Sequence, residues 1–138
     1  MPIQVIAIDP GREKCGIAVV EQSKKVLYQE VIFTIDLENK IKTLLEKYKI
    51  EKILLGNGTS SDTAKQQVEK STTPSDVEIK LVEEYRTTDA AKIRYWQSNP
   101  PRGLRRLIPT GMQVPPVPVD DYVAVILAER YFESKKEF

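Results

Sequence analysis

Three short apolar runs in the first quarter of the chain predict three β-strands. Residues 3–9 are apolar at nearly every position, which is typical of a central strand buried on both faces. Pro10 and Gly11 predict a turn, and residues 14–20 return as a second strand. Residues 25–33 alternate more openly and predict a third strand toward the edge. Together the three runs predict an antiparallel meander.

Beyond the meander, helical and strand patterns alternate. Asp36 is a good helix cap, and the apolar positions after it have helical spacing: Leu37, Ile41, Leu44, Leu45 and Tyr48. Residues 52–55 predict a short buried strand, residues 60–70 a weak polar helix, and residues 77–84 another strand. This order predicts an α/β fold with a five-stranded mixed sheet. The sheet is antiparallel at first and parallel through the crossovers, and it has helices on both faces.

A helix capped by Thr87 or Thr88 is expected to carry Ala90, Ile93 and Trp96 on one side, and Trp96 is expected to pack into the core.

A last helix is expected to begin with Asp120 or Asp121 as its cap. Residues 122–128 are apolar nearly all round, so this helix should be buried. Between the two helices, residues 99–118 hold six of the nine prolines, which predicts a stiff, extended strap. No repeat or boundary interrupts the pattern, so residues 1–138 are expected to form one domain.

The composition excludes several chemistries, because the chain has no histidine. There can be no Ser-His-Asp or Cys-His nucleophile, no imidazole base and no Cys/His zinc site. Cys15 is the one cysteine, which excludes an internal disulfide and favours a small buried residue. The start lacks a basic signal-peptide region, and no apolar run approaches the roughly 20 residues that span a bilayer. The expectation is a cytoplasmic protein without a membrane partner.

The net charge of +1 hides a local imbalance, because residues 86–106 hold six basic side chains against one acid. Arginine suits phosphate, so this segment is a candidate surface for nucleic acid. The alternative is a solvated face balanced by acids elsewhere. The candidate phosphate-binding residues are Arg12, Lys14, Arg86, Arg102, Arg105 and Arg106. Gly11 and Gly16 are candidates for a close backbone approach to the site.

Three acidic residues fall at the tips of predicted elements: Asp9, Glu84 and Asp121, with Asp120 as an alternative to the last. Carboxylates brought together repel one another unless a divalent cation lies between them, and Mg²⁺ prefers oxygen ligands. The pattern therefore allows a metal site. It also allows a turn residue at Asp9, helix caps in the last helix, and a surface ion pair of Glu84 with Arg86.

Three blocks of the chain resemble the YqgF-like (RuvX) family, which is related to the RuvC Holliday-junction resolvases. Residues 9–12 (DPGR), followed by 16–18 (GIA), resemble the opening of that family. Residues 83–90 (EEYRTTDA) are similar to its Asp-Glu-Arg-x-Thr-Thr-x-x-Ala block, and residues 121–124 (DYVA) to its closing Asp-x-x-Ala helix. The chain departs from the pattern at Tyr85, where the family has arginine. The strap also has no counterpart in the commonest form of the family.

The resemblance implies an RNase H-like fold and a nuclease that depends on Mg²⁺ or Mn²⁺. It aligns Asp9, Glu84 and Asp121 with the acidic triad of the family. It also implies a nucleic-acid substrate, either branched DNA such as a Holliday junction or structured RNA such as precursor 16S ribosomal RNA. A homodimer is the arrangement that cutting a symmetric junction would require.

Two other hypotheses remain open from the sequence. One is a catalytically silent module that binds nucleic acid or protein through the strap. The other is a phosphate-binding ATPase module, because Asp-Pro-Gly-Arg before a strand is similar to the phosphate loop of the actin and sugar-kinase superfamily. Such enzymes need two domains, and 138 residues supply one.

Overall fold

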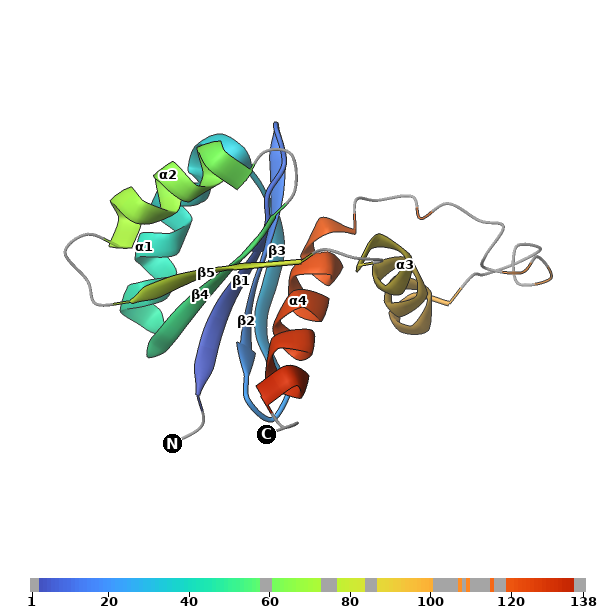
Figure 1. Cartoon of the computed structure of the whole chain (residues 1–138). Coiled ribbons are helices and arrows are strands. Elements are labelled where there is room, and N and C mark those ends of the chain that lie inside the picture. The colour runs from blue at the N-terminus through green and yellow to red at the C-terminus, as the bar shows by residue number, and fades with distance from the viewer. Residues whose placement is uncertain are drawn as a thin grey trace.

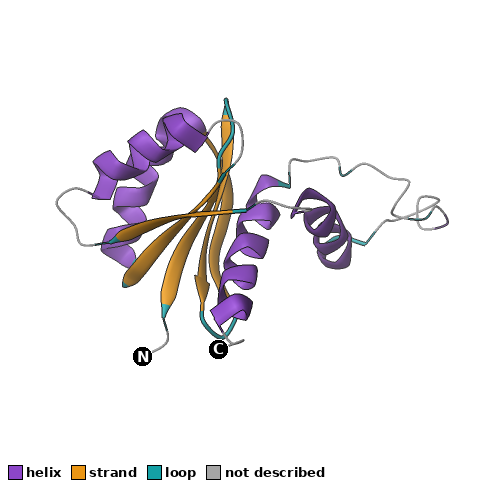
Figure 2. Ribbon diagram, in the orientation of Figure 1, coloured by secondary structure: helices purple, strands orange, loops and turns teal. Residues whose placement is uncertain are grey.

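A five-stranded sheet lies between two layers of helices (Figure 1). The structure, a computed structural model, describes residues 3–57, 61–72, 77–83, 87–100 and 119–135, and the single positions 107, 109 and 115. The strand order is β3-β2-β1-β4-β5. Figure 2 shows the strands as one continuous twisted layer. The predicted five-stranded mixed α/β sheet is confirmed.

The strands are β1 (Gln4–Asp9), β2 (Lys14–Glu21), β3 (Val26–Phe33), β4 (Ile50–Gly56) and β5 (Glu78–Val82). β1 pairs antiparallel with β2 and parallel with β4, so it is central, and its residues Val5 to Ile8 are fully buried. β3 pairs antiparallel with β2 at one edge of the sheet, and β5 pairs parallel with β4 at the other. The meander and the parallel crossovers are as predicted.

One face of the sheet is covered by α1 (Leu37–Lys47) and α2 (Ser61–Thr72). The predicted stripe of α1 packs here, with Leu37, Ile41 and Leu44 buried against Ile6 and Ile8 of β1. A one-turn 3-10 helix, Thr34–Asp36, precedes α1, and Asp36 stands at the N-cap position without a side-chain capping hydrogen bond.

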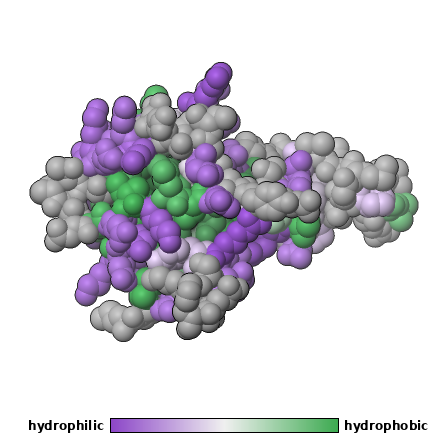
Figure 3. All heavy atoms as spheres, viewed as in Figure 1, coloured by the Kyte–Doolittle hydropathy of each residue, from purple (hydrophilic) through white to green (hydrophobic). Residues whose placement is uncertain are grey.

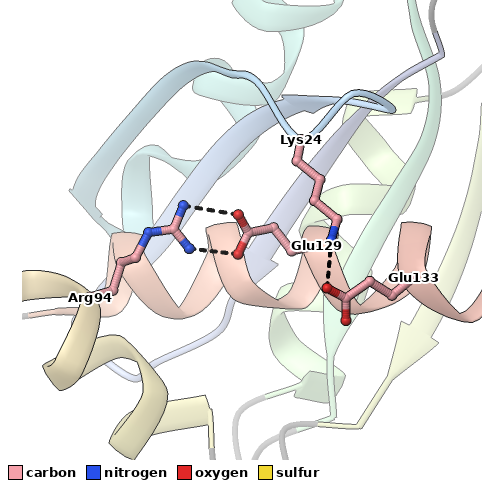
Figure 4. Close-up of polar contacts among 4 residues, drawn as sticks. All are labelled: Lys24, Arg94, Glu129 and Glu133. Carbon is pink, nitrogen blue, oxygen red and sulfur yellow. Dashed lines mark hydrogen bonds and ion pairs between the residues drawn. The ribbon is translucent and has the colours of Figure 1, made fainter. Parts of the chain in front are cut away.

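The other face is covered by α4 (Asp120–Lys135), and α3 (Thr87–Ser98) packs on α4. Residues 123–128 are all at most 7% exposed, which confirms the buried last helix. Arg94 of α3 donates two hydrogen bonds to the Glu129 carboxylate of α4, at 2.7 and 2.9 Å (Figure 4). This pair of hydrogen bonds holds the two helices together. It also pairs one of the basic side chains of residues 86–106 with an acid of the same chain.

The apolar side predicted for α3 is not the side that is most buried. The residues that are buried are Thr87, Ala91 and Tyr95, whereas Ile93 is 61% exposed and Trp96 is only partly buried. α3 rests on another helix and not on the sheet, so a narrow stripe with four-residue spacing is enough to cover the contact.

The predicted caps of the last helix are also wrong. α4 begins at Asp120, and the carbonyl oxygen of Val119 accepts the first helical hydrogen bond, from Val123 N. Both aspartates therefore lie inside the first turn, where the helix dipole still favours a negative charge.

In the view of Figure 3, apolar side chains gather over the β5 edge, with polar side chains around them. Leu81 of β5 is 48% exposed. Among the helices that the structure describes, none is long and apolar enough to cross a membrane.

Candidate functional site

Asp9 ends the central strand and stands, partly buried, at the rim of the core. It pairs across the ladder with Gly16 of β2. Side chains alternate along a strand, so Asp9 lies on the same face as Val5 and Ala7, which pack under α4. The carboxylate is therefore directed to the face on which α4 begins.

Gly16 lets the first turn of α4 approach the sheet directly. A Cβ atom at this position would overlap the carbonyl group of Asp120 and would stand 2.6 Å from the backbone nitrogen of Asp121. Only a residue without a side chain fits there. The backbone that approaches closely is thus that of the chain's own helix, and the contact holds the two aspartates beside Asp9.

The side chain of Asp120 forms a hydrogen bond with the side chain of Asp9. Burial raises the pKa of Asp120, and the negative charge of Asp121 acts in the same direction. The hydrogen bond with Asp9 and the positive charge of Lys14 oppose this rise in pKa. Asp120, which the sequence left as the alternative ligand, is therefore the one directed at Asp9.

Asp121 is held by a residue that the sequence did not single out. Gln29 of β3 donates a hydrogen bond from Nε2 to Asp121 Oδ2, at 2.8 Å and partly buried. Gln29 pairs with Ala18, so it faces α4. The sequence does contain one signal for this contact: Gln29 is a polar residue in the row of β3 side chains that faces α4.

The first hairpin carries two further predicted residues. Lys14 begins β2 as an exposed side chain, and its charge acts on Asp120. Arg12 is exposed in the turn, and at Gly11 a Cβ would overlap the carbonyl of Lys14, so this glycine serves the turn itself. The other predicted residues lie outside the described residues: Glu84, Arg86, Arg102, Arg105 and Arg106. Most of the strap at 99–118 lies outside them too.

The donor set suits a hard divalent cation, because it consists of carboxylate oxygens at the edge of a buried strand. Two of these carboxylates, from Asp9 and Asp120, approach within hydrogen-bonding reach of each other. A divalent cation between them would offset their mutual repulsion. Within the part of the chain that the structure describes, no three acidic or cysteine side chains form a complete metal-binding group.

Replacing Asp120 with asparagine is expected to stabilise the metal-free protein at neutral pH. Because the folded-state pKa of Asp120 is raised, its ionisation costs folding free energy once the pH exceeds the ordinary aspartate pKa of about 3.9. The advantage of Asp120→Asn over wild type should be absent below that pH, grow as the pH rises through the raised pKa, and then stay constant. It should not exceed about 1 kcal/mol, because water screens a partly exposed group.

Urea unfolding in EDTA across the acidic and neutral range measures this difference. Asp89→Asn is the matched control, since Asp89 is an exposed aspartate in the first turn of α3. The control should gain no stability at any pH. Equal stability of Asp120→Asn and wild type throughout would contradict the assignment.

The strand order, with an acidic residue at the end of the central strand, defines an RNase H-like fold. The chain belongs to the family of YqgF-like domains, because the family model described as the Tex protein YqgF-like domain matches residues 3–88. A curated relative is the uncharacterized protein YdcI of Bacillus subtilis (strain 168), 36% identical over 70 residues. That match covers 45% of this chain and 10% of the length of YdcI.

Two solved structures of Thermus thermophilus RuvC share the fold over almost the whole chain. The first, RuvC in complex with a Holliday junction substrate, superposes with a TM-score of 0.65 at 15% sequence identity. The second, a structure of RuvC, superposes with a TM-score of 0.63 at 14% identity. Each match covers 97% of this chain and 96% of the RuvC chain. The RNase H-like fold predicted from the resemblance is confirmed.

Proposed function

We propose that the protein is a divalent-metal-dependent endonuclease that hydrolyses phosphodiester bonds of structured nucleic acid. The observation that carries the proposal is the meeting of the Asp9 and Asp120 carboxylates, with Asp121 in the same helical turn, at the end of the central strand. The sheet that holds them belongs to an RNase H-like fold, and the structural match to RuvC covers 97% of the chain. That residues 1–138 act as one nuclease domain is part of the proposal.

Asp9 and Asp121, with Asp120 beside them, are proposed to hold Mg²⁺ or Mn²⁺, and Glu84 is proposed as the further acidic ligand. A divalent cation supplies positive charge for the leaving oxygen and lowers the pKa of a bound water. The chain has no histidine, so no imidazole takes part in proton transfer.

Lys14 and Arg12 supply positive charge at the rim of the carboxylate site. Both are exposed in the hairpin that follows Asp9, so a phosphate approaching Asp9 meets them. Arg86, Arg102, Arg105 and Arg106 are proposed to contact the backbone farther along the substrate. Their guanidinium groups match phosphate oxygens in pairs.

Branched DNA is the first substrate class to test, because the RuvC structure that shares the fold holds a Holliday junction substrate. Structured RNA is the second. A panel of a four-way junction, duplex DNA, single-stranded DNA and structured RNA should be incubated with Mg²⁺, Mn²⁺ or EDTA. Metal-dependent cleavage of at least one substrate is expected. Tight binding without cleavage of any substrate would contradict the proposal and would favour a silent binding module.

Gln29 is expected to position Asp121 for the metal. Replacing Gln29 with alanine removes the 2.8 Å hydrogen bond and should lower Mg²⁺ affinity about tenfold, as is typical when a partner of a metal ligand is lost. Calorimetric titration with Mg²⁺ measures the change. Gln22→Ala is the control, because Gln22 is an exposed glutamine in the turn after β2. Unchanged affinity in Gln29→Ala would show that the hydrogen bond does not orient a ligand.

A further inference from the structure

Phe33 exposes a large apolar ring beside the carboxylate site. It ends β3 and is 58% exposed. Its ladder partner is Lys14, two residues along β2 from Gly16, which itself pairs with Asp9. Alternation places Phe33, Lys14 and Asp9 on the face of the sheet that α4 covers. An aromatic ring and a carboxylate site therefore share one rim.

Lys14 lies between the ring and the carboxylates. Its Nζ atom stands over the Phe33 ring, 5.9 Å from the ring centroid. The same ammonium group acts electrostatically on Asp120. One exposed cation thus serves both the aromatic surface and the carboxylate site.

The backbone that carries Phe33 is tied to the hairpin that carries Asp9. Thr34 is 7% exposed, and its hydroxyl donates a hydrogen bond of 2.8 Å to the carbonyl oxygen of Gly11. The Thr34 amide donates to the carbonyl oxygen of Glu13, also at 2.8 Å, and the Cys15 sulfur lies 3.2 Å from the Thr34 hydroxyl. The backbone next to Phe33 is therefore held in place, so binding a ligand costs little backbone conformational entropy.

The paired chemistry of this surface fits a nucleotide. A flat aromatic ring offers a stacking face to a nucleobase, and the ammonium group attracts the attached phosphate. Bases inside a continuous duplex already stack on their neighbours. The ring would therefore bind a base that has no neighbour in a duplex. A purely apolar partner would gain nothing from Lys14.

We propose that Phe33 and Lys14 bind an unpaired nucleotide next to the phosphodiester bond at the carboxylates. The proposal rests on the proposed function, because it gives that site a substrate class: nucleic acid with an unpaired nucleotide beside the cleavage point. Neighbouring Ile35 is 87% exposed and has no ring, so it separates stacking from general apolar contact.

The test is binding of a short oligonucleotide that carries one 2-aminopurine, measured by fluorescence in EDTA. It is made as single-stranded DNA, as single-stranded RNA and as a DNA duplex. Wild type should quench at least one single strand and bind it more tightly than the duplex. Phe33→Leu keeps the apolar bulk but loses the ring, and should weaken that binding about 5- to 100-fold, the range for one lost base–aromatic stack. Phe33→Trp and Ile35→Ala should bind as wild type does.

Equal binding by Phe33→Leu and wild type would overturn the stacking surface. An equal loss in Ile35→Ala would also overturn it, because apolar contact would then explain the binding. Cleavage assays separate the two proposals, since the fluorescence is read without metal. Cleavage by wild type with unchanged binding in Phe33→Leu would leave the nuclease standing and remove the stacking surface. Ring-dependent binding without cleavage of any substrate would leave the stacking surface standing and remove the nuclease.

Discussion

Asp9→Asn is expected to leave the fold intact and to reduce metal-dependent cleavage at least about 10³-fold. A metal ion stabilises a phosphodiester transition state by several kcal/mol, and each 1.4 kcal/mol corresponds to a tenfold change in rate. Asparagine keeps the shape of Asp9 but loses the negative charge that attracts the cation. Its amide can still donate a hydrogen bond to Asp120, so the metal-free protein should be no less stable.

The measurement is the rate of cleavage of the best substrate of the panel in Mg²⁺. Glu13→Gln is the matched control, because Glu13 is an exposed carboxylate in the same hairpin. It loses the same charge at a residue outside the proposed ligand set, and it should cleave within a few-fold of wild type. A folded Asp9→Asn variant that cleaves at the wild-type rate would show that the acidic residues do not hold a catalytic metal.

The elements that could be predicted from the sequence are those whose surroundings are uniform. β1 is buried between two strands and two helix layers, so nearly every side chain is apolar and the pattern has one interpretation. The buried part of α4 is apolar all round for the same reason. α1 covers a broad face of the sheet, so its apolar residues recur at every turn and the helical pattern is easy to recognise.

The elements that could not be predicted depend on contacts between distant segments. α3 rests on α4 through a narrow stripe, and Ile93, an apolar residue that the sequence pattern includes, lies outside that stripe. The pairing of Gln29 with Asp121 joins residues 92 positions apart, so no local pattern contains it.

The choice between Asp120 and Asp121 depended on where α4 begins. Successive residues of a helix point about 100° apart, so only one of two neighbours can be directed at Asp9. The start at Asp120 directs that carboxylate to Asp9, while Asp121 is directed to Gln29. The family resemblance aligns Asp121 with the triad, and the geometry adds Asp120 as its close neighbour. Both therefore belong in the mutational test of the site.

Gly16→Ala is expected to unseat the first turn of α4 and to damage stability and the site together. The added Cβ would overlap the Asp120 carbonyl group and press on the backbone of Asp121, and backbone atoms cannot rotate away as a side chain can. Overpacking of a core costs typically 1–3 kcal/mol, and a backbone clash belongs at the upper end, so a loss of about 3 kcal/mol is expected. Mg²⁺ affinity should fall as well, because the clash displaces the turn that carries two of the proposed ligands.

Urea unfolding gives the loss of stability, and titration with Mg²⁺ at a temperature where the variant is folded gives the loss of affinity. Cys15→Ala is the control, since Cys15 comes directly before Gly16 on β2 and packs on the α1 side of the sheet. It should lose about 1 kcal/mol or less, the contribution of a small buried group, and should bind Mg²⁺ as wild type does. A Gly16→Ala variant with wild-type stability would show that α4 does not rest on Gly16. If it were destabilised but bound Mg²⁺ normally, the metal site would not depend on the first turn of α4. Loss of both properties is the result expected if one glycine sets the distance between the central strand and the acidic turn.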